Sequence, residues 1–459
     1  MQTDVDVAVL GAGTAGMAAY RAAVAHTDRV LLIEAERYGT TCARVGCMPS
    51  KLLIAAAEAA HASEQAWRFG VGRRGRVEVD GRAVMARVRA ERDRFVGFVV
   101  RAAEGFPDRH RLIGRARFVD DHTLEVDGRR LTARTVVIAT GSRPKIFPAF
   151  EALGDRMIVN DDVFDWDTLP RSVAVFGPGV VGLEIGQALH RLGVRVRVFG
   201  VGGFVGPLTD PEVKEEARAC FASEFPLDPD VQGLEVARVG DEVEVRFREG
   251  EHARAERFDY ALVATGRVAN VDGLGLENTS LALDRRGVPL YDPTTLRCGE
   301  SHVFIAGDAN ADVPLLHEAS DEGKIAGDNA GRWPEVRPGP RRSPLSVVFS
   351  DPQIAMVGAA RRALPDDVVV GRVSFEDQGR SRVMLQNHGR LNLYADRATG
   401  RFLGAEMVGP RAEHLGHLLA WAHQQRLTVA DMLAMPFYHP VVEEGLRTAL
   451  RDAAAQLSV

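Results

Sequence analysis

The feature that most constrains the fold is a pair of glycine-rich turns, each placed between an apolar run and a helical stretch. In the first copy, residues 5–10 are apolar except for Asp6, the turn reads Gly11-Ala-Gly13-Thr-Ala-Gly16, and a second apolar run ends at Glu34. Such glycines allow a tight turn and a close approach of a pyrophosphate, and the acid is placed to accept from ribose hydroxyls. The pattern predicts a dinucleotide-binding βαβ unit; a buried turn without a ligand is the alternative.

The second copy repeats this arrangement about the turn Gly177-Pro-Gly179-Val-Val-Gly182, between an apolar run at 173–176 and an expected strand at 194–199. Each copy is followed by a strand that ends in Ala-Thr-Gly, at Thr140-Gly141 and at Thr265-Gly266. The chain therefore contains an internal repeat of dinucleotide-binding units. The first copy is the longer one, and its extra residues include a cysteine segment and the charged helical stretch 81–103.

The cysteine segment, residues 38–51, carries Cys42 and Cys47. In a regular helix, residues five apart rise by about 7.5 Å, more than the roughly 6.8 Å that a disulfide allows between Cα atoms. A bridge would therefore need a distorted backbone, which Gly46 could permit. Residues 50–66 favour a helix, so Cys47 is expected near a helix N-terminus, where a thiolate is stabilised. This favours a redox cysteine over the alternative, two buried cysteines at chance spacing.

Composition narrows the class of protein. A chain of 459 residues should hold about three domains. Its net charge of -6 gives no basic field for a nucleic-acid partner. Neither a signal peptide nor an apolar run of membrane-spanning length is visible, so we expect a cytoplasmic protein without a membrane partner. Four cysteines are too few for a secreted disulfide scaffold. We expect no metal site.

At this point the sequence resembles the pyridine nucleotide-disulfide oxidoreductases over essentially its whole length. The resemblance rests on the two glycine turns, the segment Gly39–Lys51, His302–Asp308, Val347–Gly358 and His439-Pro440. Pro-Ser-Lys51 after the second cysteine is most similar to the dihydrolipoyl dehydrogenases. The implied fold class is α/β, with two Rossmann-like domains, for FAD and NAD, followed by an α+β dimerisation domain. The expected domains are 1–150 for FAD, 151–270 for NAD, 271–340 returning to the FAD or central domain, and 341–459 for dimerisation.

The resemblance also implies roles for individual residues. Cys42 would exchange with the substrate and Cys47 would contact the flavin, beside the pair Lys51 and Glu184. His439 would be the catalytic base, held by Glu444, and would complete the active site of the partner subunit in a homodimer. The residues implied for FAD, besides Lys51, are Gly11, Gly13, Gly16, Glu34, Thr140, Gly141, Asp308, Leu316 and His317; those implied for NAD are Gly177, Gly179, Gly182, Gly200 and Gly266.

Three positions depart from the family pattern. Arg44 replaces the usual Asn and Val441 replaces the usual Thr, which bears on the substrate channel. Gly200 stands where an acid commonly accepts from NAD and where a nearby arginine suits NADP. We expect a weak preference for NAD, with NADP as the alternative, and a sharper preference if Glu is introduced at Gly200. Arg195 and Arg197 lie on the preceding strand, where a contact with the 2′-phosphate of NADP and simple exposure to solvent are the two alternatives.

The function implied by the resemblance is NAD-dependent oxidation of dihydrolipoamide, free or on a lipoylated protein, through FAD and a redox-active Cys42–Cys47 disulfide. A reductase of another disulfide is a first alternative, although no cysteine follows Cys298, whereas mercuric reductases commonly add a C-terminal pair. A flavin-only quinone reductase or transhydrogenase is a second, for which both cysteines should be dispensable. A flavin-bound interaction protein without turnover is a third.

Overall fold

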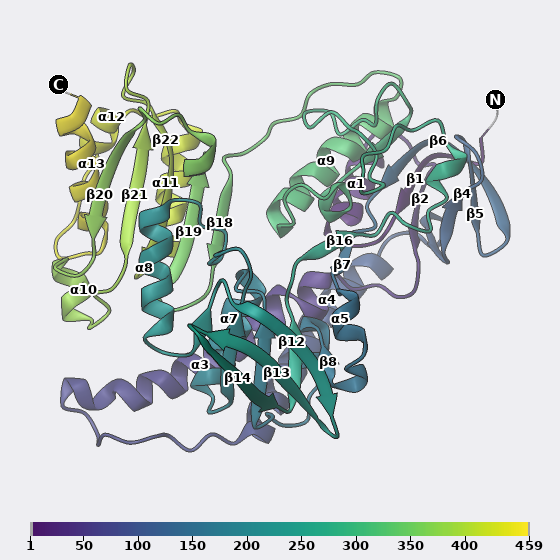
Figure 1. Cartoon of the computed structure of the whole chain (residues 1–459). Helices are drawn as coiled ribbons and strands as arrows, with labels where there is room; N and C mark the ends of the chain where they lie inside the picture. Colours follow the sequence, from purple (N-terminus) through teal and green to yellow (C-terminus); the bar gives the residue numbers. More distant parts are fainter. Residues whose placement is uncertain (1–2, 458–459) are drawn as a thin grey trace. The chain divides into compact units, whose positions relative to one another are not determined.

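The computed structural model describes residues 3–457, and its chain divides into two compact units (Figure 1). The first unit contains the segment ending at Pro49, Arg87–Lys145 and Gly266–Arg341. The second contains Ser50–Ala86, Ile146–Thr265 and the segment from Arg342 onward. Within the described residues, no helix combines the length and the apolarity needed to cross a membrane.

The first unit is built on a sheet of order β3-β2-β1-β6-β5-β4, with β17 added beside β6. The pairs β1–β2, β1–β6, β2–β3 and β6–β17 are parallel, and the outer hairpin β4–β5 is antiparallel. The bounds are β1 (Val5–Leu10), β2 (Val30–Glu34), β3 (Arg111–Ile113), β4 (Ala116–Phe118), β5 (Thr123–Val126), β6 (Arg129–Ile138) and β17 (Val303–Ile305); a separate ribbon pairs β7 (Ser142–Pro144) with β16 (Arg267–Ala269).

Helices α1 (Thr14–Ala23) and α9 (Leu316–Arg332) pack against each other through small residues. A Cβ added at Gly323 would lie 2.2 Å from the Ala15 carbonyl oxygen, and one at Gly327 would lie 2.1 Å from the Ala19 oxygen. Both contacts advance by four residues in each helix, so the helices run in the same direction. This close crossing brings the start of α9 to the end of the unit where the first glycine turn lies.

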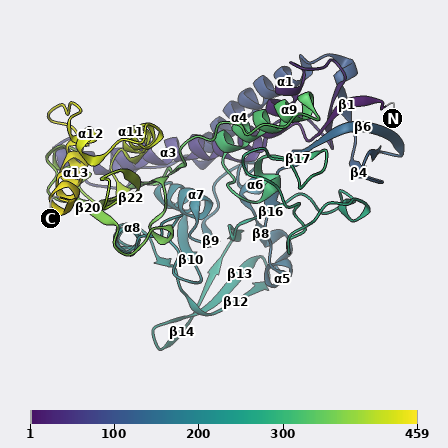
Figure 2. The ribbon, with the colours of Figure 1, turned by 90° about the horizontal axis from the view of Figure 1, so that it is seen from above.

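The second unit carries a parallel sheet of order β11-β10-β9-β15-β8. Figure 2 labels three of its strands, β8, β9 and β10. The second glycine turn joins β9 (Ser172–Phe176) to α7 (Val180–Arg191), and β10 (Arg195–Phe199) follows. The predicted strands and helix of this copy are therefore present. The other members are β8 (Met157–Ile158), β11 (Leu227–Asp228) and β15 (Tyr260–Val263), and an antiparallel sheet follows β11: β12 (Gln232–Val239), β13 (Glu242–Glu249) and β14 (His252–Phe258).

The C-terminal part of the second unit is an antiparallel sheet of order β18-β19-β22-β21-β20. Helices α11 (Ala412–Gln424) and α13 (Glu443–Leu457) pack on one face, and α8 (Pro211–Ala222) packs on the other (Figure 1). Leu391 and Leu393 face the core under α11 and α13, so the alternating Asn392 and Tyr394 point toward α8. The strands are β18 (Leu345–Val348), β19 (Gln353–Gly358), β20 (Val369–Ser374), β21 (Arg390–Ala395) and β22 (Phe402–Gly409).

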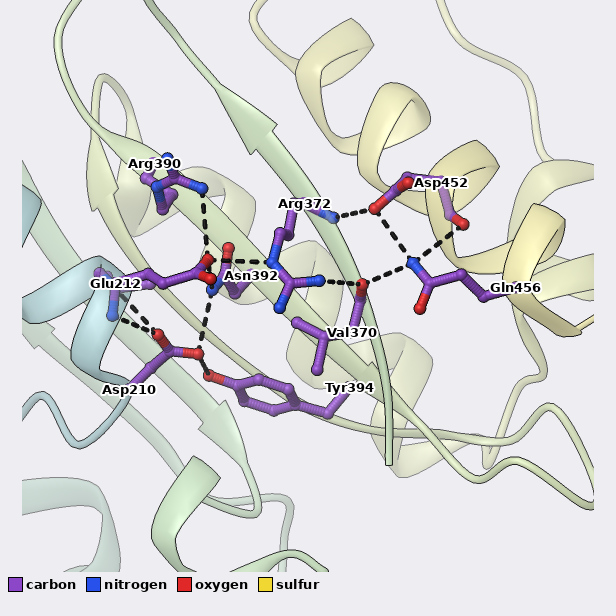
Figure 3. Close-up of polar contacts among 10 residues, drawn as sticks. Asp210, Glu212, Val370, Arg372, Arg390, Asn392, Tyr394, Asp452 and Gln456 are labelled. Carbon is purple, nitrogen blue, oxygen red and sulfur yellow. Dashed lines mark hydrogen bonds and ion pairs between the residues drawn. The ribbon is translucent and has the colours of Figure 1, made fainter. Parts of the chain in front are cut away.

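A polar network joins α8 to this sheet (Figure 3). Asp210 caps α8 by accepting from the amides of Glu212 and Val213, and it also accepts from Asn392 and from the Tyr394 hydroxyl at 2.9 Å. Burial raises the pKa of Tyr394, so this hydroxyl keeps the proton that it donates. Beyond Asp210, Glu212 accepts from Arg372 Nε of β20 at 2.9 Å.

The remaining long helices are α3 (Cys47–Gln65) and α4 (Gly81–Glu104). Shorter helices are α2 (Thr41–Val45), α5 (Pro148–Glu151), α6 (Asn160–Val163), α10 (Gly379–Val383) and α12 (Val429–Leu433). The predicted fold class, two dinucleotide-binding units followed by an α+β part, is confirmed.

Candidate active site

Cys42 and Cys47 lie on either side of a break between two helices. Thr40 caps α2 by accepting from the Ala43 amide, and α2 ends at Gly46, whose φ of -125° and ψ of -117° are not helical. Because a Cβ at Gly46 would lie 3.0 Å from the Thr41 carbonyl oxygen, this turn is tight. Helix α3 then begins at Cys47, earlier than the predicted start at residue 50. Cys47 is exposed at its positive end, and Cys42 is half-buried.

Lys51 lies one turn along α3, and the structure brings it onto Glu184 of α7. The Lys51 Nζ to Glu184 Oε2 distance is 2.7 Å, and the Glu184 side chain is only 5% exposed. The other oxygen, Oε1, accepts from the Phe349 amide at 2.9 Å, and the Phe349 ring lies 4.6 Å from Lys51 Nζ. A buried carboxylate with both oxygens occupied is fixed in position, and Lys51 compensates its charge. Sequence reasoning missed Phe349, although it lies in a motif used for the resemblance.

The first glycine turn forms a cradle that fits the phosphates of a dinucleotide. Gly11 has a φ of +102°, and Gly16 packs so closely that an added Cβ would lie 1.8 Å from the Gly11 carbonyl oxygen. In contrast, a Cβ at Gly13, the N-cap of α1, would meet nothing within 4 Å, which leaves room for a ligand. Glu34 at the end of β2 accepts from the Ala12 amide at 2.8 Å, so its carboxylate is held beside the turn.

Other residues predicted for FAD lie at the same carboxyl edge of this sheet. Asp308 follows β17, and its carboxylate accepts from the Ser142 hydroxyl at 2.7 Å, just beyond Thr140 and Gly141. Ser142 also accepts from Arg267 Nε at 2.7 Å, so these two residues orient Asp308. Sequence reasoning missed both, although Ser142 directly follows the Ala-Thr-Gly signal. Leu316 and His317, both exposed, open α9.

The second glycine turn has the same backbone geometry as the first. Gly177 has a φ of +106°, and a Cβ at Gly182 would lie 1.9 Å from the Gly177 carbonyl oxygen. Gly179, like Gly13, has open space where a Cβ would point. Gly266 follows the strand β15 and has a φ of +106° with open space beside it. A phosphate-binding role for both turns fits this geometry.

The structure adds two facts about β10 and about Gly200, which follows it. A Cβ at Gly200 would lie 2.6 Å from Pro178 Cγ and 2.7 Å from the Pro229 carbonyl oxygen, so Glu cannot be introduced there without displacing the backbone. Arg197 does not face solvent: its side chain is 13% exposed and pairs with Glu249 at 3.1 Å and with Glu256 at 3.0 Å. Arg195 is more exposed and pairs with Glu256 at 3.1 Å.

His439 lies on the segment before α13, with 79% of its side chain exposed. The structure brings Glu444 onto it: Glu444 Oε2 is 3.0 Å from His439 Nδ1. Glu444 Oε1 accepts from Arg447 at 2.7 Å, a contact that sequence reasoning missed. Burial acts to raise the pKa of Glu444, but the hydrogen bonds from His439 and the Val441 amide outweigh it and lower that pKa. Helix α13 begins at Glu443, beyond Pro440.

The second unit also contains a cavity of about 1030 Å³ at the far end of α3 from the cysteines. Arg191, Glu224 and Asp351 are among its lining residues, and none of the predicted site residues in the described chain is. Arg191 pairs with Glu224 at 2.6 Å and with Asp351 at 3.0 Å, so these charges already satisfy one another. We therefore place the chemistry at the cysteines and not in this cavity.

Comparisons with known proteins show which family the chain belongs to. Residues 5–323 match the family model described as pyridine nucleotide-disulphide oxidoreductase, and residues 345–450 match its dimerisation domain. The chain is 29% identical to a dihydrolipoyl dehydrogenase of Bacillus subtilis, with 98% of each chain covered. It is 30% identical to a mercuric reductase of Shigella flexneri, covering 96% of this chain and 80% of that protein. The solved structure of LpdA from Mycobacterium tuberculosis matches with a TM-score of 0.82, 26% identity and coverage of 97% and 99%.

Proposed function

Because the chain belongs to the pyridine nucleotide-disulphide oxidoreductase family, whose cofactors are FAD and NAD(P), we propose that it is an NAD-dependent dihydrolipoyl dehydrogenase. The observation that carries the proposal is the pair Cys42 and Cys47 around the break before α3, on the helix whose Lys51 is held by Glu184. A dithiol substrate is the natural partner of such a cysteine pair. The substrate is dihydrolipoamide, free or attached to a protein.

The chemistry at the cysteines is thiol–disulfide exchange. A substrate thiolate attacks Cys42 Sγ of the oxidised pair, the Cys42–Cys47 bond breaks, and Cys47 leaves as a thiolate at the positive end of α3. The second substrate thiolate then attacks the substrate sulfur bound to Cys42, which closes the lipoamide disulfide and releases Cys42. His439 accepts the proton of the substrate dithiol, and Glu444 holds the imidazole and stabilises its charged form.

The two cofactors fit the two glycine cradles. Gly11, Gly13, Gly16 and Glu34 would hold the adenosine half of FAD, and Asp308 would hold its ribityl chain. When bound, FAD would supply the acceptor for the electron pair of the reduced cysteines, and NAD would supply the final acceptor. Lys51 and Glu184 would lie beside the flavin as a compensated ion pair, so the redox centre contains no isolated buried charge.

The match to the dimerisation domain supports a homodimer. We propose that His439 of each subunit completes the site of its partner, which accounts for an imidazole that is mostly exposed within its own chain. We also propose domains at 1–150 and 271–340 for FAD, 151–270 for NAD and 341–459 for dimerisation.

The proposal is tested by a steady-state panel on the purified holoprotein. We expect dihydrolipoamide to be oxidised with NAD, and glutathione disulfide, mercuric ion and a quinone to be reduced far more slowly with NADH or NADPH. Unchanged turnover after Cys42→Ser, with a quinone as the best acceptor, would assign a flavin-only reductase. A colourless protein that takes up no FAD would contradict the whole assignment.

A further inference from the structure

We propose that Asp230 is the residue that discriminates NAD from NADP, replacing the acid that the strand end at Gly200 lacks. This inference rests on the nicotinamide site of the proposed function and names its specificity determinant. In a dinucleotide-binding unit, the loop after the second strand meets the adenosine ribose, where NADP carries its additional phosphate. Here that loop is residues 200–206, which follows β10 and contains no charged side chain.

The first step of the argument is that Gly200 cannot supply the acid. A side chain there would collide with Pro178 and with the Pro229 carbonyl oxygen. The same contacts show what lies beside the loop: the segment after β11. Gly200 donates to the Asp228 carbonyl oxygen at 2.7 Å, and Gly203 donates to that of Pro229 at 3.0 Å. Residues 228–231 are therefore attached to the ribose loop by its own backbone.

The second step is that Asp230 lies in this attached segment. Its Oδ1 accepts from the Gly202 amide at 2.7 Å. Asp230 therefore occupies a loop amide that could otherwise bind a phosphate, and it brings a negative charge to the loop. Its second oxygen, Oδ2, has no partner in the described part of the chain and can accept from a ribose hydroxyl.

The third step is that no cation on the strand before the loop is left to attract a 2′-phosphate. Arg197 is paired with Glu249 and Glu256, and it also lies 3.7 Å from Asp228. Its guanidinium carbon lies 4.3 Å from the centre of the Phe247 ring, so the whole group is enclosed. A phosphate of charge about -2 would meet Asp230 without a compensating arginine from β10, whereas a ribose diol would gain an acceptor.

The test measures binding to the FAD-loaded protein by calorimetry, with ADP-ribose and 2′-phospho-ADP-ribose as probes. Asp230→Asn removes the charge while its amide oxygen can still accept from Gly202. We expect this variant to bind 2′-phospho-ADP-ribose about tenfold more tightly and ADP-ribose no more than about threefold more weakly. Asp241→Asn, an exposed acid on the β12–β13 turn of the same domain, is the matched control and should change neither affinity.

A salt series separates charge from loop structure. In the unaltered protein, raising the salt concentration should screen Asp230 and so reduce the preference for ADP-ribose over 2′-phospho-ADP-ribose. In Asp230→Asn, the ratio of the two affinities should be nearly independent of salt concentration. The inference would be overturned if the variant bound both probes more weakly by the same factor. It would also be overturned if the unaltered protein bound 2′-phospho-ADP-ribose more tightly than ADP-ribose. Failure of both probes to bind would overturn it together with the nicotinamide site. If both probes bound as expected but the protein did not oxidise dihydrolipoamide, only the proposed function would be overturned.

Discussion

Cys42 and Cys47 differ in their surroundings although only four residues separate them. Cys47 is exposed as the first residue of α3, whereas Cys42 is half-buried in α2. A thiolate is favoured at a helix N-terminus, so Cys47 is the cysteine better suited to hold negative charge beside an electron acceptor. We therefore expect the two single serine variants to differ in their spectra and in their activity.

We predict that Cys42→Ser keeps the long-wavelength absorption of a thiolate beside oxidised flavin and loses dithiol turnover by about 10³-fold or more. Cys47→Ser should lose both. His439→Ala should slow turnover by about 10²- to 10⁴-fold, the usual worth of a general base, without loss of flavin. Absorption spectra and steady-state rates on the same preparations check this. Lipoamide turnover at the normal rate in Cys42→Ser would show that the roles are assigned wrongly.

At the scale of elements, the start of α8 is the best-defined structural junction of the second unit (Figure 3). Asp210 caps the helix and binds two side chains of β21, and all three residues are buried. Buried Glu406 of β22 accepts from the amides of Thr209 at 2.7 Å and Asp210 at 2.8 Å. Helix α8 is thereby attached to the sheet that supports α13 and His439.

We predict that Asp210→Ala lowers the free energy of unfolding by about 2 to 4 kcal/mol, from a lost cap and unsatisfied buried donors. Tyr394→Phe should cost about 1 to 2 kcal/mol. The double variant should cost less than the sum, with a coupling of about 1 kcal/mol. Denaturant unfolding measures all three, and Glu215→Ala on the exposed face of α8 should stay within about 0.5 kcal/mol. Strict additivity would show that Asp210 and Tyr394 do not interact.

The sequence predicts elements whose patterns are local. The strand, turn and helix around Gly177 follow from apolar periodicity and glycine spacing, as does the first copy around Gly11. The sequence could not predict contacts between segments that are far apart in the chain. A side chain at Gly200 would collide with Pro178 and Pro229, and the Phe349 amide binds Glu184, 165 residues away. Arg197 has the alternation of an exposed strand residue, but carboxylates of the later strands enclose it.

At the scale of the whole molecule, the exposed His439 and the cysteine pair give a test of where each active site is assembled. We predict that a heterodimer of Cys42→Ser and His439→Ala subunits has about half the turnover of the unaltered dimer, whereas each homodimeric variant is nearly inactive. In the heterodimer, only one site pairs an intact cysteine with the partner's intact histidine. Differently tagged, co-expressed subunits allow this species to be purified and assayed. An inactive heterodimer would show that His439 acts within its own chain.

The last prediction concerns pH and stability. Burial lowers the pKa of His61, His190, His302 and His423 in the folded protein. At these four histidines, the unfolded chain therefore binds more protons than the folded one just below pH 6.5, the ordinary pKa of histidine. Two carboxyls whose pKa values burial raises, those of Glu58 and Glu322, act in the opposite direction. Stability rises with pH wherever the unfolded state binds more protons, so it should fall between about pH 7 and 5, before the paired carboxylates titrate.

His302 offers the clearest single-residue test of this dependence of stability on pH. It is buried, Nε2 donates to the Asp121 carbonyl oxygen at 2.6 Å, and its ring stacks on His122 at 4.0 Å, so a proton added to it meets a second imidazole. We expect His302→Gln to reduce the loss of thermal stability between pH 7 and 5, although it lowers stability at pH 7 by removing a buried hydrogen bond. The exposed His252→Gln is the control and should leave the slope unchanged. Melting temperatures at constant ionic strength would contradict the argument if they stayed level, or rose, as the pH fell.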